Sequence, residues 1–268
     1  MESYLKDRSR LFNADSEFLC PDECDRRGCK DPQLHVSVSL IDLIAISRNY
    51  GKKVSQLFRD DLKIGFDPLP GREPWVGRLS LELKKPCVFF DGKWCSVYSS
   101  RPIPCALFPE YLWMTYPPDT LLQRELIRDF PCIQRPGPIS PQRKKTLQQL
   151  SEMCLREFFL SDLYLFGVSP LIIDLKNIAG EGLDELSKRE DGLFQLPHEK
   201  VEKMIYDRLS SGGYLKEWEE KIERIDREDL LEELGRMKTL TDSMIRESTS
   251  CSVAYQFEGN RLRPIHLL

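Results

Sequence analysis

Residues 87–109 read CVFFDGKWCSVYSSRPIPCALFP. Two short runs of β-branched and aromatic residues, Val88–Phe90 and Trp94–Tyr98, flank the dipeptide Asp91-Gly92. Such a dipeptide between two strand-forming runs is typical of a tight hairpin turn. The sequence therefore predicts a β-hairpin in this stretch, with one cysteine near each end of it and a third cysteine after it.

The hairpin cysteines belong to a larger group. The chain has nine cysteines, an odd number, and disulfides are disfavoured in a reducing compartment. Seven of the nine fall within the first 140 residues, and scattered core thiols would not crowd in this way. Thiolates bind soft and borderline metals, and a closed site takes four of them. We predict that metal ligands come from Cys20, Cys24, Cys29, Cys87, Cys95, Cys105 and Cys132.

The predicted ligand set is all sulfur. The three histidines, His35, His198 and His266, have no ligand spacing with one another or with the cysteines. All-sulfur sites suit both an iron–sulfur cluster, such as a 4Fe–4S cluster, and zinc. The number of thiolates favours the cluster, whereas the absence of a motif for an electron-transfer partner favours zinc. A four-ligand site also leaves up to three thiols spare, and these could support the ligands, bind a second metal or be redox-active.

The remaining two cysteines fit structural roles. Cys154 shares an apolar helix face with Leu150 and Phe158, so we expect it in the core, and Cys251 is expected to be an ordinary thiol. The run 143–145, Arg-Lys-Lys, is typical of a solvated helix start and is given no function.

The cysteines of the opening stretch occur together with Arg101-Pro102 and Phe108-Pro109, and Cys132 is followed by Pro136-Gly137. In this order the motifs resemble the signature of the YkgJ-type cysteine-cluster family, and the resemblance covers residues 17–140. That family is described as a zinc- or iron-chelating domain and is related to flagellin lysine N-methylases. The N-terminal cysteines are spaced more loosely here than in the family pattern, which has an adjacent Cys-Cys pair.

Three functions are compatible with these features. The first is a metal-binding protein that holds an iron–sulfur cluster or zinc through its cysteines. The second, implied by the resemblance, is a cluster-dependent enzyme that modifies a protein substrate, similar to a lysine N-methylase. The third is a metal-stabilised structural or interaction module. Arg101 could pair with cluster thiolates or bond turn carbonyls, and Tyr98 is expected to pack beside the site, so both are candidate cofactor contacts.

Composition limits the partners. The chain has 268 residues, a formal net charge of −4 and a pI of about 5.6, which argues against nucleic-acid binding through bulk positive charge. The longest uncharged run, residues 163–173, is much shorter than the roughly 20 residues that span a bilayer. Residues 1–10 lack the apolar segment of a signal peptide. We expect a cytoplasmic protein without a membrane partner.

The fold class follows from periodicity. Ser39 as an N-cap, Asp42 three residues later and Gly51 as a C-cap predict one helix, and residues 54–62 a second. Alternation predicts strands over 78–84 and 253–257. Further helices are predicted over 144–166, 199–209, 214–225 and 229–245. The prediction is an α+β fold with a small cysteine-rich core containing the hairpin (residues 1–140) and a mainly helical half (residues 141–268), packed as one folding unit.

Overall fold

The computed structural model describes residues 2–18, 20, 23–179, 187–188, 194–195, 198–225 and 253–266. The chain divides into two compact units: unit 1 comprises Met1–Leu62 and Glu82–Phe158, and unit 2 comprises Lys63–Leu81 and Phe159–Leu268. This division differs from a single boundary at residue 140. One reason is that the helix predicted to open the second half, α9 (Pro141–Phe166), runs without a break from unit 1 into unit 2.

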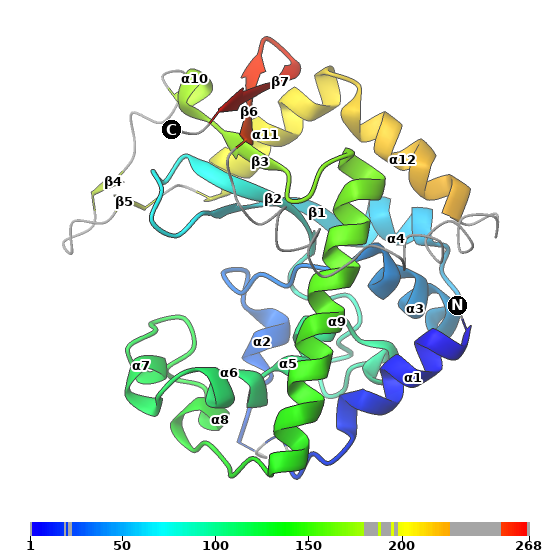
Figure 1. The fold of residues 1–268 in the computed structure, drawn as a ribbon, viewed down its shortest axis with the longest axis vertical. Helices are drawn as coiled ribbons and strands as arrows, with labels where there is room; N and C mark the ends of the chain where they lie inside the picture. The colour runs from blue at the N-terminus through cyan, green and yellow to red at the C-terminus, as the bar shows by residue number, and fades with distance from the viewer. Residues whose placement is uncertain are drawn as a thin grey trace. The chain divides into compact units, whose positions relative to one another are not determined.

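Unit 1 is built from helices, most of them short (Figure 1). Those of eight residues or more are α1 (Glu2–Asn13), α3 (Leu40–Tyr50), α4 (Val54–Asp61) and the first part of α9. The cysteine-bearing regions instead contain turns and short helices, because prolines repeatedly interrupt the backbone. These are α2 (Arg27–Lys30), η1 (Tyr98–Ser100), α5 (Ile103–Leu107), α6 (Glu110–Thr115), α7 (Pro118–Leu122) and α8 (Pro131–Gln134).

The predicted helix after Ser39 is confirmed with its caps. The Ser39 hydroxyl accepts a hydrogen bond from the backbone N–H of Asp42 at 2.9 Å, and the Asp42 carboxylate accepts one from the N–H of Ser39 at 2.8 Å. This reciprocal pair is a capping box. Gly51 ends the helix with a φ of 73°, a left-handed conformation that costs glycine little. The helix predicted over 54–62 is also present, as α4.

The predicted hairpin is reduced to a single bridge between Phe90 and Cys95. The Asp91 carboxylate accepts hydrogen bonds from the backbone N–H groups of Lys93 and Trp94, at 2.8 and 2.6 Å. These side-chain bonds turn the chain sharply, and the backbone then enters η1 instead of extending a second strand. The turn was therefore predicted in the right place, but the strands on both sides of it were not formed.

Unit 2 carries a five-stranded sheet in the order β1-β2-β3-β6-β7. The strands predicted over 78–84 and 253–257 are confirmed as β2 and β6. Neighbours β2 and β3 are antiparallel, β3 and β6 are parallel, and β6 and β7 are antiparallel. The bounds are β1 (Leu62–Pro68), β2 (Val76–Leu83), β3 (Ile172–Asp174), β6 (Val253–Glu258) and β7 (Arg261–His266).

Besides the predicted strand β6, the second half of the chain contains two strands that were not predicted, β3 and β7. It also contains the small antiparallel pair β4 (Ser187–Lys188) and β5 (Phe194–Gln195). The short helix α10 (Lys176–Ala179) follows β3. The α+β class is confirmed by this mixed sheet beside the helices.

Two predicted helices pack within unit 2, α11 (His198–Ser211) and α12 (Tyr214–Ile225). The Trp218 ring meets Phe166 edge-on at 4.7 Å, and the Tyr214 hydroxyl accepts a hydrogen bond from the N–H of Leu262. The helix predicted over 229–245 and Cys251 lie outside the described residues. Among the helices that the structure describes, none is both long and apolar enough to cross a membrane.

Candidate metal centre

Two hydrogen bonds join the N-terminal cysteine loop to the segment that begins near Cys87. Cys29 lies in α2, and its carbonyl accepts a hydrogen bond from the N–H of Cys87 at 2.8 Å. One residue earlier, the Gly28 carbonyl accepts a bond from the Lys85 ammonium at 2.5 Å. The N-terminal cysteine loop is thus joined to the start of the opening stretch, although many residues separate them in the sequence.

Four thiols form a mutually interacting group, which we call the thiol tetrad: Cys29, Cys87, Cys95 and Cys105. In each pair of the four, the charge of one thiol would raise the pKa of the other. The members come from three different local structures, α2, the bridged turn and α5. Four thiolates are the number that a closed metal site requires.

Burial dominates the chemistry of the tetrad. It raises the pKa of all four thiols, and the neighbouring sulfurs raise it further, because several thiolates in one place repel one another. Lys85 acts in the opposite direction on Cys29, Cys87 and Cys105. A bound cation would remove the repulsion between the thiolates, so the arrangement suits a metal far better than free anionic sulfur.

The other three predicted ligands form a second group, the thiol triad: Cys20, Cys24 and Cys132. Burial raises the pKa of Cys20 to about 11, and a hydrogen bond with Cys24 adds to the shift. Burial is the largest cause that raises the pKa of Cys132 to about 12, and the charges of Cys24 and Cys20 raise it further. The two groups adjoin each other, because Cys29 of the tetrad also interacts with Cys20 and Cys24.

The sulfur spacing tests which metal group fits. A single zinc ion at about 2.3 Å from each sulfur holds its thiolates about 3.8 Å apart. Among the described residues, no three thiols have sulfurs that all lie within 4.8 Å of one another. A polynuclear iron–sulfur cluster is larger than one ion and takes its thiolates on different iron atoms, so it spreads the sulfurs further apart. The described sulfurs would therefore have to move closer together to bind one zinc ion through three or more thiolates.

Arg101 bonds a turn carbonyl, as one of its two predicted roles requires, and its pairing with cluster thiolates stays a prediction. Its guanidinium donates to the Tyr98 carbonyl at 2.7 Å and to the Asn13 side chain at 3.0 Å, and it stacks 3.8 Å from the centre of the Tyr98 ring. Burial lowers its pKa, whereas Tyr98, Cys105 and Cys95 favour the charged form. Arg101 is thus a turn-bonding cation within electrostatic reach of two tetrad sulfurs.

Arg26 is a charged residue near the predicted ligands that the sequence did not single out. It has a φ of 59°, rare for a residue with a side chain, and its charge acts on Cys20 and Cys29. Its guanidinium lies 6.0 Å from the Trp94 ring, and its Nη1 is buried without a hydrogen-bond partner. Nothing in the local sequence distinguishes Arg26 from its neighbour Arg27, so only the fold could reveal it.

Two buried ion networks support the helices around the site. Arg8 pairs with both Asp42 and Glu157, and Glu157 also accepts hydrogen bonds from Tyr4 and Ser39. In the second network, Arg143 pairs with Glu110 at 2.5 Å and also donates to backbone carbonyls at the end of α1. Arg143 is 1% exposed, so the prediction that it belongs to a solvated helix start is wrong.

Cys154 lies as predicted. It packs against the apolar cluster that contains Leu150 and the α1 residue Phe12. Its role is consistent with core packing rather than with the metal centre.

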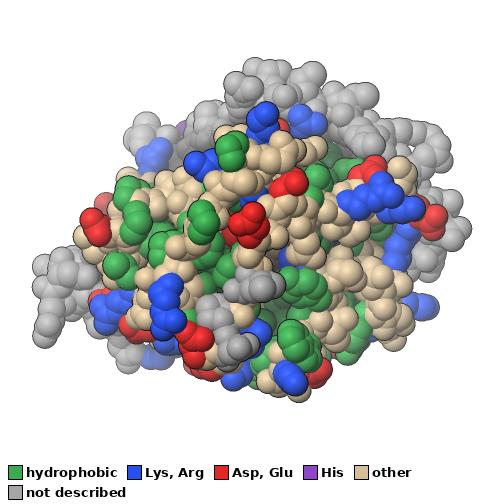
Figure 2. Space-filling model, turned by 90° about the horizontal axis from the view of Figure 1, so that it is seen from below, with side chains coloured by type: hydrophobic (Ala, Val, Ile, Leu, Met, Phe, Trp, Pro, Cys, Tyr) green, Lys and Arg blue, Asp and Glu red, His purple; other side chains and the backbone are tan. Residues whose placement is uncertain are grey.

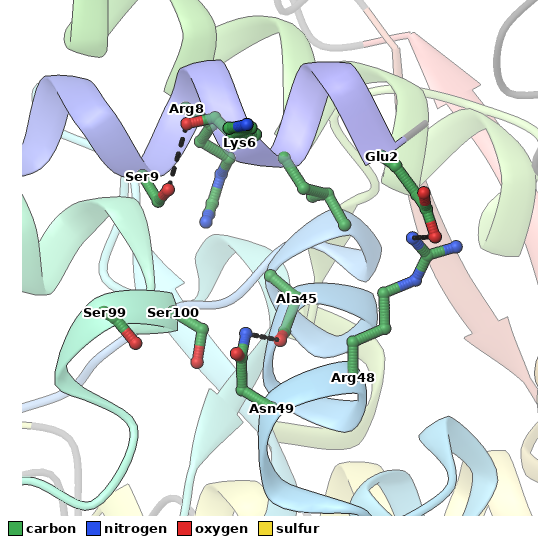
Figure 3. Close-up of a pocket in the computed structure, with 10 residues that line it drawn as sticks. Glu2, Lys6, Arg8, Ser9, Ala45, Arg48, Asn49, Ser99 and Ser100 are labelled. Carbon is green, nitrogen blue, oxygen red and sulfur yellow. Dashed lines mark hydrogen bonds and ion pairs between the residues drawn. The ribbon is translucent and has the colours of Figure 1, made fainter.

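A separate polar cavity of about 240 Å³ lies between α1, α3 and η1 (Figure 3). Its lining includes Lys6, Arg8 and Arg48, and Arg48 pairs with Glu2 at 3.6 Å. None of the predicted ligand cysteines lines it. Figure 2 shows hydrophobic, basic and acidic side chains mixed on one face of the protein. The described part of that face is therefore not covered by charge of a single sign.

Comparisons with known proteins do not identify a relative. No protein-family model matches the chain, and neither a curated protein nor a solved structure matches it. The resemblance to the YkgJ-type family stays a prediction from the motifs.

Proposed function

We propose that this protein binds an iron–sulfur cluster through the thiolates of Cys29, Cys87, Cys95 and Cys105. The observation that carries the proposal is the tetrad itself, in which every pair of the four sulfurs interacts although they come from separate segments. Four thiolates are the usual ligand set of a 4Fe–4S or 2Fe–2S cluster. When bound, such a cluster supplies one-electron redox chemistry.

The sulfur spacing supports a cluster over zinc. No three described thiols have sulfurs within 4.8 Å of one another, which is wider than a single zinc ion holds its thiolates, whereas a cluster takes its thiolates on different iron atoms. The chain's own residues would then define its environment. Lys85 and Arg101 place positive charge near the sulfurs, and a positive environment stabilises the more reduced, more negative state of a cluster.

The test is an anaerobic purification followed by a visible spectrum and an assay of iron, sulfide and zinc per chain. A brown protein with iron and sulfide near four each supports a 4Fe–4S cluster. A colourless protein with one zinc per chain overturns the proposal.

Matched variants assign the ligands. Cys105→Ser removes a tetrad sulfur and should lose most of the iron, whereas Cys154→Ser removes a core thiol and should retain it. Equal iron in both variants would contradict the tetrad. Because serine at position 105 can also disturb folding, Cys95→Ser provides a second tetrad variant at a less buried sulfur, and circular dichroism reports whether each variant is folded.

A second candidate function is action on a protein partner or substrate next to the metal centre. The observation that favours it is exposed hydrophobic surface between Cys87 and Cys105: the side chains of Val88, Trp94 and Tyr98 are 51%, 61% and 55% exposed. Large apolar side chains left in water beside a candidate cofactor site are typical of docking surfaces. Under the lysine N-methylase-like version, the cluster-loaded protein should bind S-adenosylmethionine in calorimetry, and no binding would remove that version.

A further inference from the structure

The polar cavity between α1, α3 and η1 has no role in the proposed function, because none of the predicted ligand cysteines lines it. All of its lining residues belong to unit 1. Its volume of about 240 Å³ lies just below the roughly 300–1,000 Å³ that is usual for ligand pockets. The cavity is therefore of a size for a small ligand.

Arg8 brings a hydrogen-bond donor to this cavity from a buried side chain. The side chain is 1% exposed and points from α1 toward α3 and η1 (Figure 3). Its hydrogen bonds use Nε and Nη2, which donate to Glu157 and Asp42. Nη1 is thus left without an acceptor in the part of the chain that the structure describes. Its N–H groups are available to an oxygen atom of a bound molecule, and a charged donor favours an anionic acceptor.

Two further cations line the cavity and are free to attract an anion. Lys6, from α1, makes no ion pair with any residue that the structure describes. Arg48, from α3, pairs with Glu2 at 3.6 Å, but the Glu2 side chain is 92% exposed and such a pair is weak. Arg48 can therefore exchange this contact for one with a ligand. Since two carboxylates already balance Arg8, the attraction for an anion comes from Lys6 and Arg48, and Arg8 fixes its position.

The opposite side of the cavity offers hydrogen-bond acceptors. Asn49 of α3 and both Ser99 and Ser100 of η1 line it. The Asn49 amide donates to the Ala45 carbonyl at 2.9 Å, and the Ser100 hydroxyl donates to the Val97 carbonyl at 3.4 Å. Because their hydrogens are used in this way, the oxygens of Asn49 and Ser100 are suited to accept from hydroxyl groups of a ligand.

We propose that this cavity binds the phosphate group of a small molecule that also carries hydroxyl groups. A phosphate group presents several oxygens in different directions and so can meet donors from two helices at once, whereas a planar carboxylate has only two oxygens. Arg8 Nη1 donates to the phosphate, and Lys6 and Arg48 balance its charge. The acceptors on α3 and η1 take the hydroxyl groups. The inference does not rest on the proposed cluster.

The test is calorimetry on the full chain, purified without oxygen, with three compounds at equal ionic strength: glycerol phosphate, inorganic phosphate and sodium acetate. We expect one saturable site for glycerol phosphate, with inorganic phosphate weaker and acetate at least tenfold weaker. Inorganic phosphate that binds as tightly as glycerol phosphate would make the free ion the ligand and overturn the role of the hydroxyl acceptors. No binding, or equal binding of all three compounds, overturns the site.

A matched pair of variants locates the binding. Lys6→Gln and Arg10→Gln each remove one exposed cation from α1, but only Lys6 lines the cavity. Lys6→Gln should weaken the binding of glycerol phosphate at least threefold, whereas Arg10→Gln should change it less than twofold. Equal losses in the two variants would mean that the charge of α1 as a whole attracts the compound, and they would overturn the cavity as its site.

Two further variants change the cavity without changing its charge. Ser99→Leu fills part of the cavity from an exposed position, and Arg8→Lys keeps the cation but removes Nη1. Each should weaken binding at least tenfold, and circular dichroism reports whether each variant is folded. Because Arg8→Lys also alters buried ion pairs, Ser99→Leu decides the test if Arg8→Lys does not fold. Unchanged binding in Ser99→Leu overturns the site.

One cysteine variant separates this inference from the proposed cluster. Cys95→Ser should lose iron and keep its affinity for glycerol phosphate, because Cys95 does not line the cavity. Loss of both iron and phosphate binding in a folded Cys95→Ser variant would assign the phosphate to the metal centre and overturn the cavity site. A wild-type chain that holds no iron but binds glycerol phosphate through Lys6 refutes the cluster and retains the cavity site.

Discussion

Unit 1 contains two polar regions that are stabilised in different ways. The first region, which we call the ion-paired side, consists of the nearly fully buried Arg8, Asp42 and Glu157. Arg8 pairs with both carboxylates, and Tyr4 and Ser39 donate hydrogen bonds to Glu157. The second region, which we call the thiol side, consists of the short helices and turns that carry the seven predicted ligand cysteines, each of them half-buried or buried. The carboxylates of the first side are paired by protein groups alone, whereas the second gathers groups that repel one another when ionised. The ion-paired side is therefore a scaffold, and the thiol side is the region to which the proposed function assigns binding.

The largest effect is expected from removing the metal. Under the proposed function, chelation in the absence of oxygen should increase hydrogen exchange at least tenfold in residues 27–30 and 87–105, because metal–thiolate bonds would contribute directly to folding there. Exchange in α3 should change less than twofold, since its capping box and ion pairs do not involve sulfur. Equal loss of protection in both regions would show that the two sides are not independent.

Breaking the ion-paired side should destabilise the protein with or without metal. Arg8→Leu leaves Asp42 and Glu157 buried without their cation, and such a loss costs about 3–5 kcal/mol. Urea unfolding measures this loss as a decrease in the free energy of unfolding. The control is Arg10→Ala in the same helix, where an exposed pair with Asp7 contributes less than about 1 kcal/mol. Similar midpoints for the two variants would contradict the scaffold role.

The ion-paired side should also respond to pH. Burial raises the pKa of Glu157 from 4.5 to about 7, and the charge of Asp42 adds to the shift while Arg8 opposes it, because two carboxyl groups share one guanidinium. The native state then binds more protons than the unfolded state between about pH 4.5 and 7. The contribution of Glu157 to stability therefore falls as pH rises through that window, by up to about 3 kcal/mol.

Urea unfolding at pH 5, 6, 7 and 8 measures this dependence, and Glu157→Gln, which cannot ionise, should flatten it. A wild-type profile that rises with pH over the same range would contradict the raised pKa.

The smallest effect concerns the helix cap that joins the ion-paired side to local structure. Ser39→Ala removes the hydroxyl that caps α3 and donates to Glu157, and the expected loss is about 1–2 kcal/mol. Ser9→Ala serves as the control, because the Ser9 hydroxyl bonds only a carbonyl of its own helix. Thermal unfolding that does not distinguish the two variants would contradict the role of the cap.

Elements with strong local signals were predictable. The helix after Ser39 was found because its capping residues act within one turn, and β2 and β6 were found because alternation is a local pattern. Strand β3 was missed because three residues are too few to show a period, and β7 because its polar residues and Pro264 are untypical of a strand. The hairpin was overpredicted because the chain enters a tight turn after Cys95, where the N–H of Tyr98 donates to the Cys95 carbonyl, so the second strand does not extend.

The sequence by itself determined the chemistry available to this protein: its crowded thiols, the paucity of histidine, the turn at Asp91 and the cap at Ser39. Only the tertiary structure decided which groups became neighbours. It joined Cys87 to Cys29 through a backbone hydrogen bond, buried Arg143 against Glu110, and left Arg26 Nη1 without a partner. The physical reason is that spacing along a chain constrains neighbours only within a few residues, whereas burial and charge pairing depend on segments that folding brings together from far apart.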